Sequence, residues 1–164
     1  MTFPTQGSTV VVRSDEAEFL GADGYPVAVR LLADATATGG ALSTQRVTLG
    51  RGADGASPHL HKSSSELFFI LDGSAQILAG ADVVTLQAGD LAVVPPATAH
   101  AFAAPPGATA DLLIVITPGV ERFEYFRLLA RFAQGQATRD DLLAAQDRFD
   151  NHLLDSPEWR AARP

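Results

Sequence analysis

The chain has no cysteine among its 164 residues. A disulfide framework and a thiolate metal site are therefore excluded, and any metal must be held by histidines and carboxylates. Basic residues are also scarce, with 12 Lys and Arg against 19 Asp and Glu and a formal net charge of −7. Because an acidic protein offers no counter-charge to nucleic acid or to an anionic membrane surface, we expect neither as a partner.

Long apolar runs are missing as well. No stretch approaches the length needed to cross a bilayer, and residues 1–7 lack the basic and apolar regions of a signal peptide. These absences lead us to expect a cytoplasmic protein. A chain of this length can bury one sizeable core, so we expect one domain with an appendage.

Three of the four histidines fall into one pattern with a glutamate. Side chains in a strand alternate faces, so His59 and His61 project from the same face about 7 Å apart. Glu66 starts an apolar run that ends at 72–73 and is typical of a buried strand closed by a turn. An ionised carboxylate there needs a partner. His100, after the apolar segment 91–96, completes a metal site of three nitrogens and one oxygen.

Two stretches around these residues resemble the two sequence motifs of the cupin family. Residues 55–73 contain the His-x-His pair, the glutamate after four intervening residues and the closing glycine. Residues 89–100 keep the spacing of the glycine, proline and histidine of the second motif. Ala97 stands where the family usually has glycine, and Ala104 where it often has asparagine. The resemblance covers about residues 40–118, and neither departure falls on a metal ligand that the family pattern implies.

Within that family the chain is similar to the small, quercetin dioxygenase-like branch, whose barrel exit the segment at 118–126 also resembles. The resemblance implies an all-β fold, a double-stranded β-helix or jelly-roll barrel, over residues 1–118, with a C-terminal helical extension over 119–164. It also implies a divalent transition metal (Fe, Mn, Ni, Co, Cu or Zn) on His59, His61, Glu66 and His100. Cupins commonly pair through edge strands, so we expect a homodimer.

The pattern of apolar residues predicts the elements around the site. Alternation predicts strands at 8–13 and 27–32, and an apolar run predicts a central strand at 111–117. Helical spacing over 120–132 predicts a helix that Gly135 stops. Thr138 is predicted to cap a second helix reaching Phe149, and Ser156 with Pro157 to start a third. His152 has no ligand-spaced neighbour and is interpreted as structural.

A substrate pocket is predicted on the inner face of the barrel. If Glu66 points inward, alternation also directs Phe68 and Ile70 inward, and His100 carries Phe102 with it. Arg46 and Thr48 lie on the preceding strand and are further candidates for the pocket. The aromatic residues Phe123, Tyr125 and Phe126 pack as core or cover one mouth of the barrel.

The predicted reaction is a dioxygenase-like oxidation of an aromatic or enolic small molecule. Glu66 is the residue on which this chemistry turns, since it either anchors the ion or serves as a base. One alternative is an isomerase or cyclase that acts on a polyketide-like substrate through the same ion as a Lewis acid. The other is a non-catalytic small-molecule-binding barrel.

Overall fold

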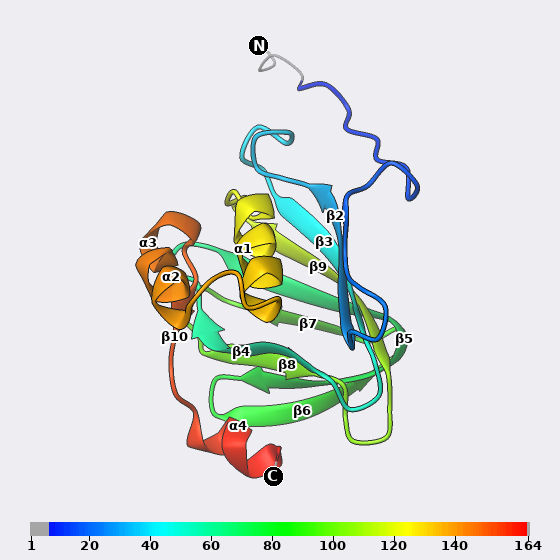
Figure 1. The fold of residues 1–164 in the computed structure, drawn as a ribbon, viewed down its shortest axis with the longest axis vertical. Helices are drawn as coiled ribbons and strands as arrows, with labels where there is room; N and C mark the ends of the chain where they lie inside the picture. Colours follow the sequence, from blue (N-terminus) through cyan, green and yellow to red (C-terminus); the bar gives the residue numbers. More distant parts are fainter. Residues whose placement is uncertain (1–6, 164) are drawn as a thin grey trace, which may run out of the picture.

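The computed structural model describes residues 7–163, and Figure 1 shows its arrangement. The strands are β1 Phe19–Leu20, β2 Val27–Ala33, β3 Ser43–Leu49, β4 Asp54–Leu60, β5 Ser65–Ala79, β6 Asp82–Gln87, β7 Leu91–Val94, β8 His100–Ala103, β9 Ala110–Thr117 and β10 His152–Leu153. The helices are α1 Phe123–Ala133, α2 Arg139–Ala144, α3 Gln146–Phe149 and α4 Pro157–Ala162. The predicted fold class is confirmed, with a mostly β body and short helices in the C-terminal part.

One long strand joins the two layers of the sheet. The strands follow the order β1-β2-β3-β9-β5-β8-β4-β10, and β6 and β7 also pair with β5. The first part of β5 pairs antiparallel with β9 and β7, and its second part with β6 and β8. Figure 1 shows the resulting sheet curled on itself, with α1, α2 and α3 gathered at one side and α4 beside β6.

Gly73 lets β5 pass from one layer to the other. The sequence predicts a turn at Asp72 and Gly73, but the strand continues through both, with a register shift between Ile70 and Asp72. Gly73 has φ +71, and a Cβ there would lie 2.1 Å from the Thr109 carbonyl oxygen. The turn signal therefore marks a bend within one strand, where only glycine fits.

Alternating side chains from both layers fill the space between them. Buried residues of this main core include Val47, Leu49, Phe68, Ile70, Ile77, Leu112 and Ile114. Each such side chain contributes about 1.5–3 kcal/mol when fully buried. The strands predicted at 27–32 and 111–117 match β2 and β9.

The prediction of a strand at residues 8–13 is wrong. Residues 8–13 form no strand, and Val11 is 65% exposed. A valine-rich segment satisfies strand propensity, but an isolated strand gains nothing without a partner strand and a core face.

The helix boundaries follow local capping chemistry. α1 ends two residues before Gly135, which has φ +72. The Thr138 and Asp141 side chains form the reciprocal capping box of α2, and the Ser156 hydroxyl accepts from the Trp159 N–H in α4. The second predicted helix divides into α2 and α3 at Ala145.

The C-terminal segment is joined to the sheet. β10 pairs antiparallel with β4, and Trp159 packs against Leu78, Ala101 and Ala103. The domain division at residue 118 stays a prediction. Within residues 7–163, no helix is long and apolar enough to cross a membrane.

Candidate metal centre

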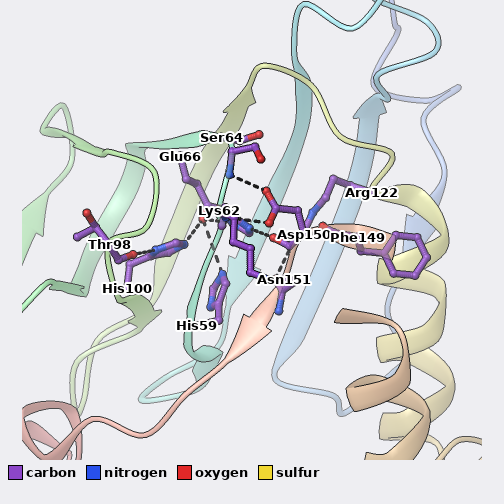
Figure 2. A network of polar contacts seen from close by, with 12 residues as sticks. His59, Lys62, Ser64, Glu66, Thr98, His100, Arg122, Phe149, Asp150 and Asn151 are labelled. Atoms are coloured by element: carbon purple, nitrogen blue, oxygen red, sulfur yellow. Dashed lines mark hydrogen bonds and ion pairs between the residues drawn. The ribbon is translucent and has the colours of Figure 1, made fainter. Parts of the chain in front are cut away.

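The four predicted ligands come together between β4, β5 and β8. His59 lies on β4 with His61 just beyond its end, Glu66 is the second residue of β5, and His100 begins β8 directly opposite His59. All four are buried, with 1–3% of each residue exposed. One donor atom from each lies within 4.8 Å of the others. Figure 2 shows His59, Glu66 and His100 pointing toward one another.

Each histidine is fixed by a backbone carbonyl. Nδ1 of His59 donates to Ser57 O at 2.8 Å, and Nδ1 of His100 donates to Thr98 O at 2.8 Å. Nδ1 of His61 donates to Asp150 O at 2.5 Å. Because a carbonyl can only accept, Nδ1 must carry the proton, and in the neutral ring this leaves the Nε2 lone pair free for a metal.

Glu66 carries the negative charge of the cluster. Its Oε2 lies 2.6 Å from Nε2 of His100, 3.1 Å from that of His61 and 3.9 Å from that of His59. Burial alone would raise the pKa of Glu66, but hydrogen bonds and positive charge from His100 and His61 outweigh it and hold this pKa well below its usual value. The carboxylate is therefore ionised at neutral pH.

The histidines respond in opposite ways. Burial, with the charge of His100, lowers the pKa of His59 well below its usual value. Burial also opposes charge on His100, but attraction to the nearby Glu66 carboxylate outweighs it and raises the pKa of His100.

The cluster fits a divalent transition metal. Imidazole nitrogens with one carboxylate oxygen suit Fe, Mn, Ni, Co, Cu or Zn. Donors bound at 2.0–2.2 Å lie no more than about 4.4 Å apart, so small side-chain rotations close the observed spread. Nε2 of His100 lies close to Glu66 but lacks hydrogen-bond alignment, which makes it one of the few buried side-chain atoms without a partner among the described residues. A metal ion would satisfy it.

Asp150 ties the C-terminal segment to the centre. Besides the carbonyl that holds His61, its carboxylate accepts from the backbone N–H groups of Lys62 and Ser63 at 2.8 and 3.0 Å. Figure 2 shows Asp150 beside Lys62. His152, interpreted as structural, lies in β10 with its Nε2 3.2 Å from Asp150 Oδ1.

A cavity of about 500 Å³ opens beside the metal ligands. Its walls are mostly apolar, and they include Val29, Val47, Phe102, Ile114, Phe126 and Leu129. Gln45, His59, Glu66, Arg122 and Asn151 are the main polar groups in the lining. A site of this kind holds a small organic molecule with a few oriented polar contacts.

The family model described as "Cupin domain" matches residues 45–116. The matched segment is similar to that domain and covers less than half of the chain. It contains all four candidate metal ligands, β5 and the whole of β8.

Solved structures share the fold. An RmlC-like cupin from Shewanella frigidimarina is 20% identical with a TM-score of 0.57, over 72% of this chain and 96% of that chain. A predicted oxalate decarboxylase from Thermotoga maritima is 24% identical with a TM-score of 0.55, over 65% and 97%. A variant of Streptomyces Pac13 with uridine is 13% identical with a TM-score of 0.56, over 93% and 98%. These identities show the fold alone. No curated protein matches the chain.

Ala97 keeps the backbone of the cupin turn before His100. It has φ +59, the left-handed conformation that glycine adopts without strain. For alanine this conformation costs about 1–2 kcal/mol. The Ala97 N–H donates to His61 O at 2.7 Å, which links the two ligand segments. The substitution therefore leaves the position of His100 intact.

The structure places the predicted pocket residues differently. Phe102 lines the cavity, whereas Phe68 and Ile70 are fully buried in the core. Arg46 and Thr48 face outward on β3, where Arg46 Nε donates to Asp111 Oδ1 at 2.8 Å. They therefore lie outside the cavity, because β3 turns the opposite side chains inward.

Several polar residues of the site are not predicted from the sequence. Gln45 could have been found, because it shares the parity of the apolar residues Val47 and Leu49. Arg122 stands out as a cation at the start of an aromatic stripe. Nothing near Asp150 or Asn151 in the sequence indicates that they lie beside the cupin ligands.

Of the aromatic residues predicted at the mouth, Tyr125 and Phe126 line the cavity. Phe123 does not, and its ring lies under the Arg127 guanidinium instead.

Proposed function

We propose that this cupin is a metal-dependent enzyme that carries out a dioxygenase-like oxidation of an aromatic or enolic small molecule. The observation that carries the proposal is the meeting of three fixed imidazoles and Glu66 at the wall of a mostly apolar cavity of about 500 Å³. His59, His61, Glu66 and His100 would hold a divalent ion, which would supply Lewis acidity to a substrate bound in the cavity.

The chain's own residues would orient the substrate and manage its proton. A bound divalent ion supplies Lewis acidity and, for a redox-active metal, electron transfer to oxygen. His59, His61 and His100 hold their Nε2 atoms toward one point and would bind the ion, and Glu66 would either anchor the ion or accept a proton from a substrate hydroxyl. Phe102, Phe126 and the other apolar walls exclude water from the reacting groups.

Non-oxidative chemistry at the same centre is the second candidate. Structural neighbours include Pac13, described as a nucleoside dehydratase, and a sugar phosphate isomerase from Silicibacter pomeroyi. Their presence favours an isomerase or cyclase that uses the ion as a Lewis acid. A barrel that binds a small molecule without reaction is the third.

Metal analysis of protein purified without chelator tests the proposal. We expect near-stoichiometric iron, manganese, nickel, cobalt or copper in the wild type and its loss in the His59→Ala, His100→Ala double variant. The His152→Ala variant is the control and should keep its metal, because it removes the one histidine outside the cluster.

Substrate screening then separates the candidates. Oxygen uptake with aromatic diols supports the oxidation, while turnover of a polyketide-like substrate without oxygen supports the Lewis-acid reaction. A metal-free wild type would contradict both and favour the binding barrel.

The predicted homodimer is part of this proposal. β1 lies at the end of the strand order, and Phe19 on it is 54% exposed. An edge with unpaired backbone groups and an apolar side chain favours pairing with a second copy. Light scattering at micromolar concentration would contradict the dimer if it returned the mass of one chain.

A further inference from the structure

Arg122 is a buried cation in the wall of the cavity. It precedes α1, and its backbone N–H donates to Asp34 Oδ1 at 2.6 Å. The residue is 3% exposed and lines the same cavity as His59 and Glu66. Figure 2 shows its side chain directed toward Asn151, on the side of the metal ligands.

The guanidinium is held by neutral groups. Nη1 donates to Phe149 O and Nη2 to Asn151 Oδ1, each at 3.2 Å. Its face lies over the Tyr125 ring, with 4.5 Å between the guanidinium carbon and the ring centroid. These contacts fix its position but bring no negative charge.

The positive charge has no direct ionic partner. Among residues 7–163, no carboxylate oxygen lies within 4.0 Å of the Arg122 guanidinium, and its Nε has no hydrogen-bond partner. The two carboxylate oxygens of Asp34 accept hydrogen bonds from the backbone N–H groups of Arg122 and Phe123. Glu66 is engaged by the histidines. An arginine stays charged in proteins, and burying its charge unpaired is expensive.

A bound metal makes the imbalance larger. A divalent ion on Glu66 and three neutral imidazoles leaves positive charge at the centre, and Arg122 adds another cation to the same mostly apolar cavity. Opposite charge is worth most where water is excluded. The cavity is therefore electrostatically suited to an organic anion.

We propose that Arg122 and Asn151 form an anion subsite that selects small aromatic or enolic carboxylates, with the carboxylate on Arg122 and the reacting oxygen toward the metal ligands. The proposal rests on the metal-dependent function above. The Arg122 Nε–H has no hydrogen-bond partner among the described residues, and the Asn151 amide lies next to the guanidinium. The apolar body of the ligand would pack against Phe126 and Phe102, which line the same cavity.

A matched pair of probes tests the subsite. We would measure binding of 2-hydroxybenzoate and 2-hydroxybenzamide to the metal-loaded full chain by calorimetry. Both carry the same ring and hydroxyl, and only the first is an anion. We expect the wild type to prefer the carboxylate by at least about tenfold, the effect of one charge-assisted hydrogen bond.

Four variants assign the preference. Arg122→Met should abolish it, and Arg122→Lys should retain part of it because the charge remains. Arg131→Met is the matched control, since Arg131 is an exposed arginine of α1, and it should bind as the wild type does. Asn151→Asp is nearly isosteric and places a carboxylate next to Arg122, so it should abolish the preference even if Arg122→Met fails to fold.

Metal content, measured on the same samples, separates this inference from the proposed function. Loss of the preference with metal content unchanged supports the subsite. A preference that survives in Asn151→Asp overturns it, because the carboxylate then binds elsewhere, as on the metal. Equal binding of the two probes by the metal-loaded wild type, or binding of neither, also overturns it. A wild type that takes up no metal contradicts the proposed function instead.

Discussion

Replacing Asp150 by glycine should weaken the metal centre without touching a ligand. Asp150 has φ +48, a conformation that glycine adopts freely, so the change removes only the carboxylate. The loss of two charge-assisted hydrogen bonds to Lys62 and Ser63, partly exposed, should lower the free energy of unfolding by about 2–4 kcal/mol. The Asp150 carbonyl then no longer holds His61 firmly, and loss of such a partner lowers metal affinity about 10–100-fold.

Two measurements on the same protein test this reasoning. Urea unfolding of the metal-free protein gives the stability, and competition with a chromophoric chelator gives the metal dissociation constant. Asp150→Asn is the control, because its amide oxygen keeps one acceptor and asparagine tolerates the left-handed conformation. If Asp150→Gly loses stability but binds metal as tightly as the wild type, Asp150 does not position His61.

Three further predictions concern residues of α1 and β5. Burial raises the pKa of Tyr125, although the charge of Arg122 opposes this effect. A Tyr25→Phe variant leaves Tyr125 as the single tyrosine, so its phenolate absorbance should appear only at a pH above the ordinary tyrosine pKa of 10.0. The unfolded tyrosine ionises first, so stability should fall as the pH rises past about 10, and ionisation at the ordinary value would contradict the burial argument. In urea unfolding, Gly73→Ala should lower the free energy of unfolding far more than Gly39→Ala does. Both glycines have positive φ, but only at Gly73 would a Cβ meet a backbone oxygen. Equal losses of stability in the two variants would refute this close approach. Ile70→Val should cost about 1 kcal/mol and leave probe binding unchanged in calorimetry, since Ile70 is core; altered binding would return it to the pocket.

The clustering of the four candidate ligands and the fold class could be predicted because their signals are local. His59 and His61 are two residues apart at the end of β4, and the spacing to Glu66 and His100 is that of the cupin motifs. The helix starts at Thr138 and Ser156 were equally readable, since capping depends on a few neighbouring residues. Hydrophobic periodicity and capping chemistry depend on residues within one element, so they can be interpreted without knowing the rest of the fold.

What could not be predicted depends on pairing across the chain. The 8–13 segment has the composition of a strand but no partner, and the turn signal at Gly73 became a bend because β5 pairs on both sides of it. The prediction that Arg46 lines the pocket failed for a related reason, because a shift of one residue exchanges the two faces of a strand. Arg122 and Asp150 reach the site only through tertiary contacts.

The bond between Asp150 and His61 also sets an order of events during protein synthesis. All four metal ligands leave the ribosome before Asp150, which follows His100 by about 50 residues, or several seconds at roughly 5–20 residues per second. A nascent chain thus carries the complete donor set while His61 still lacks the carbonyl that orients it. A metal ion at this site would therefore gain its full set of oriented ligands only after β10, the last strand in the sequence, has paired with β4.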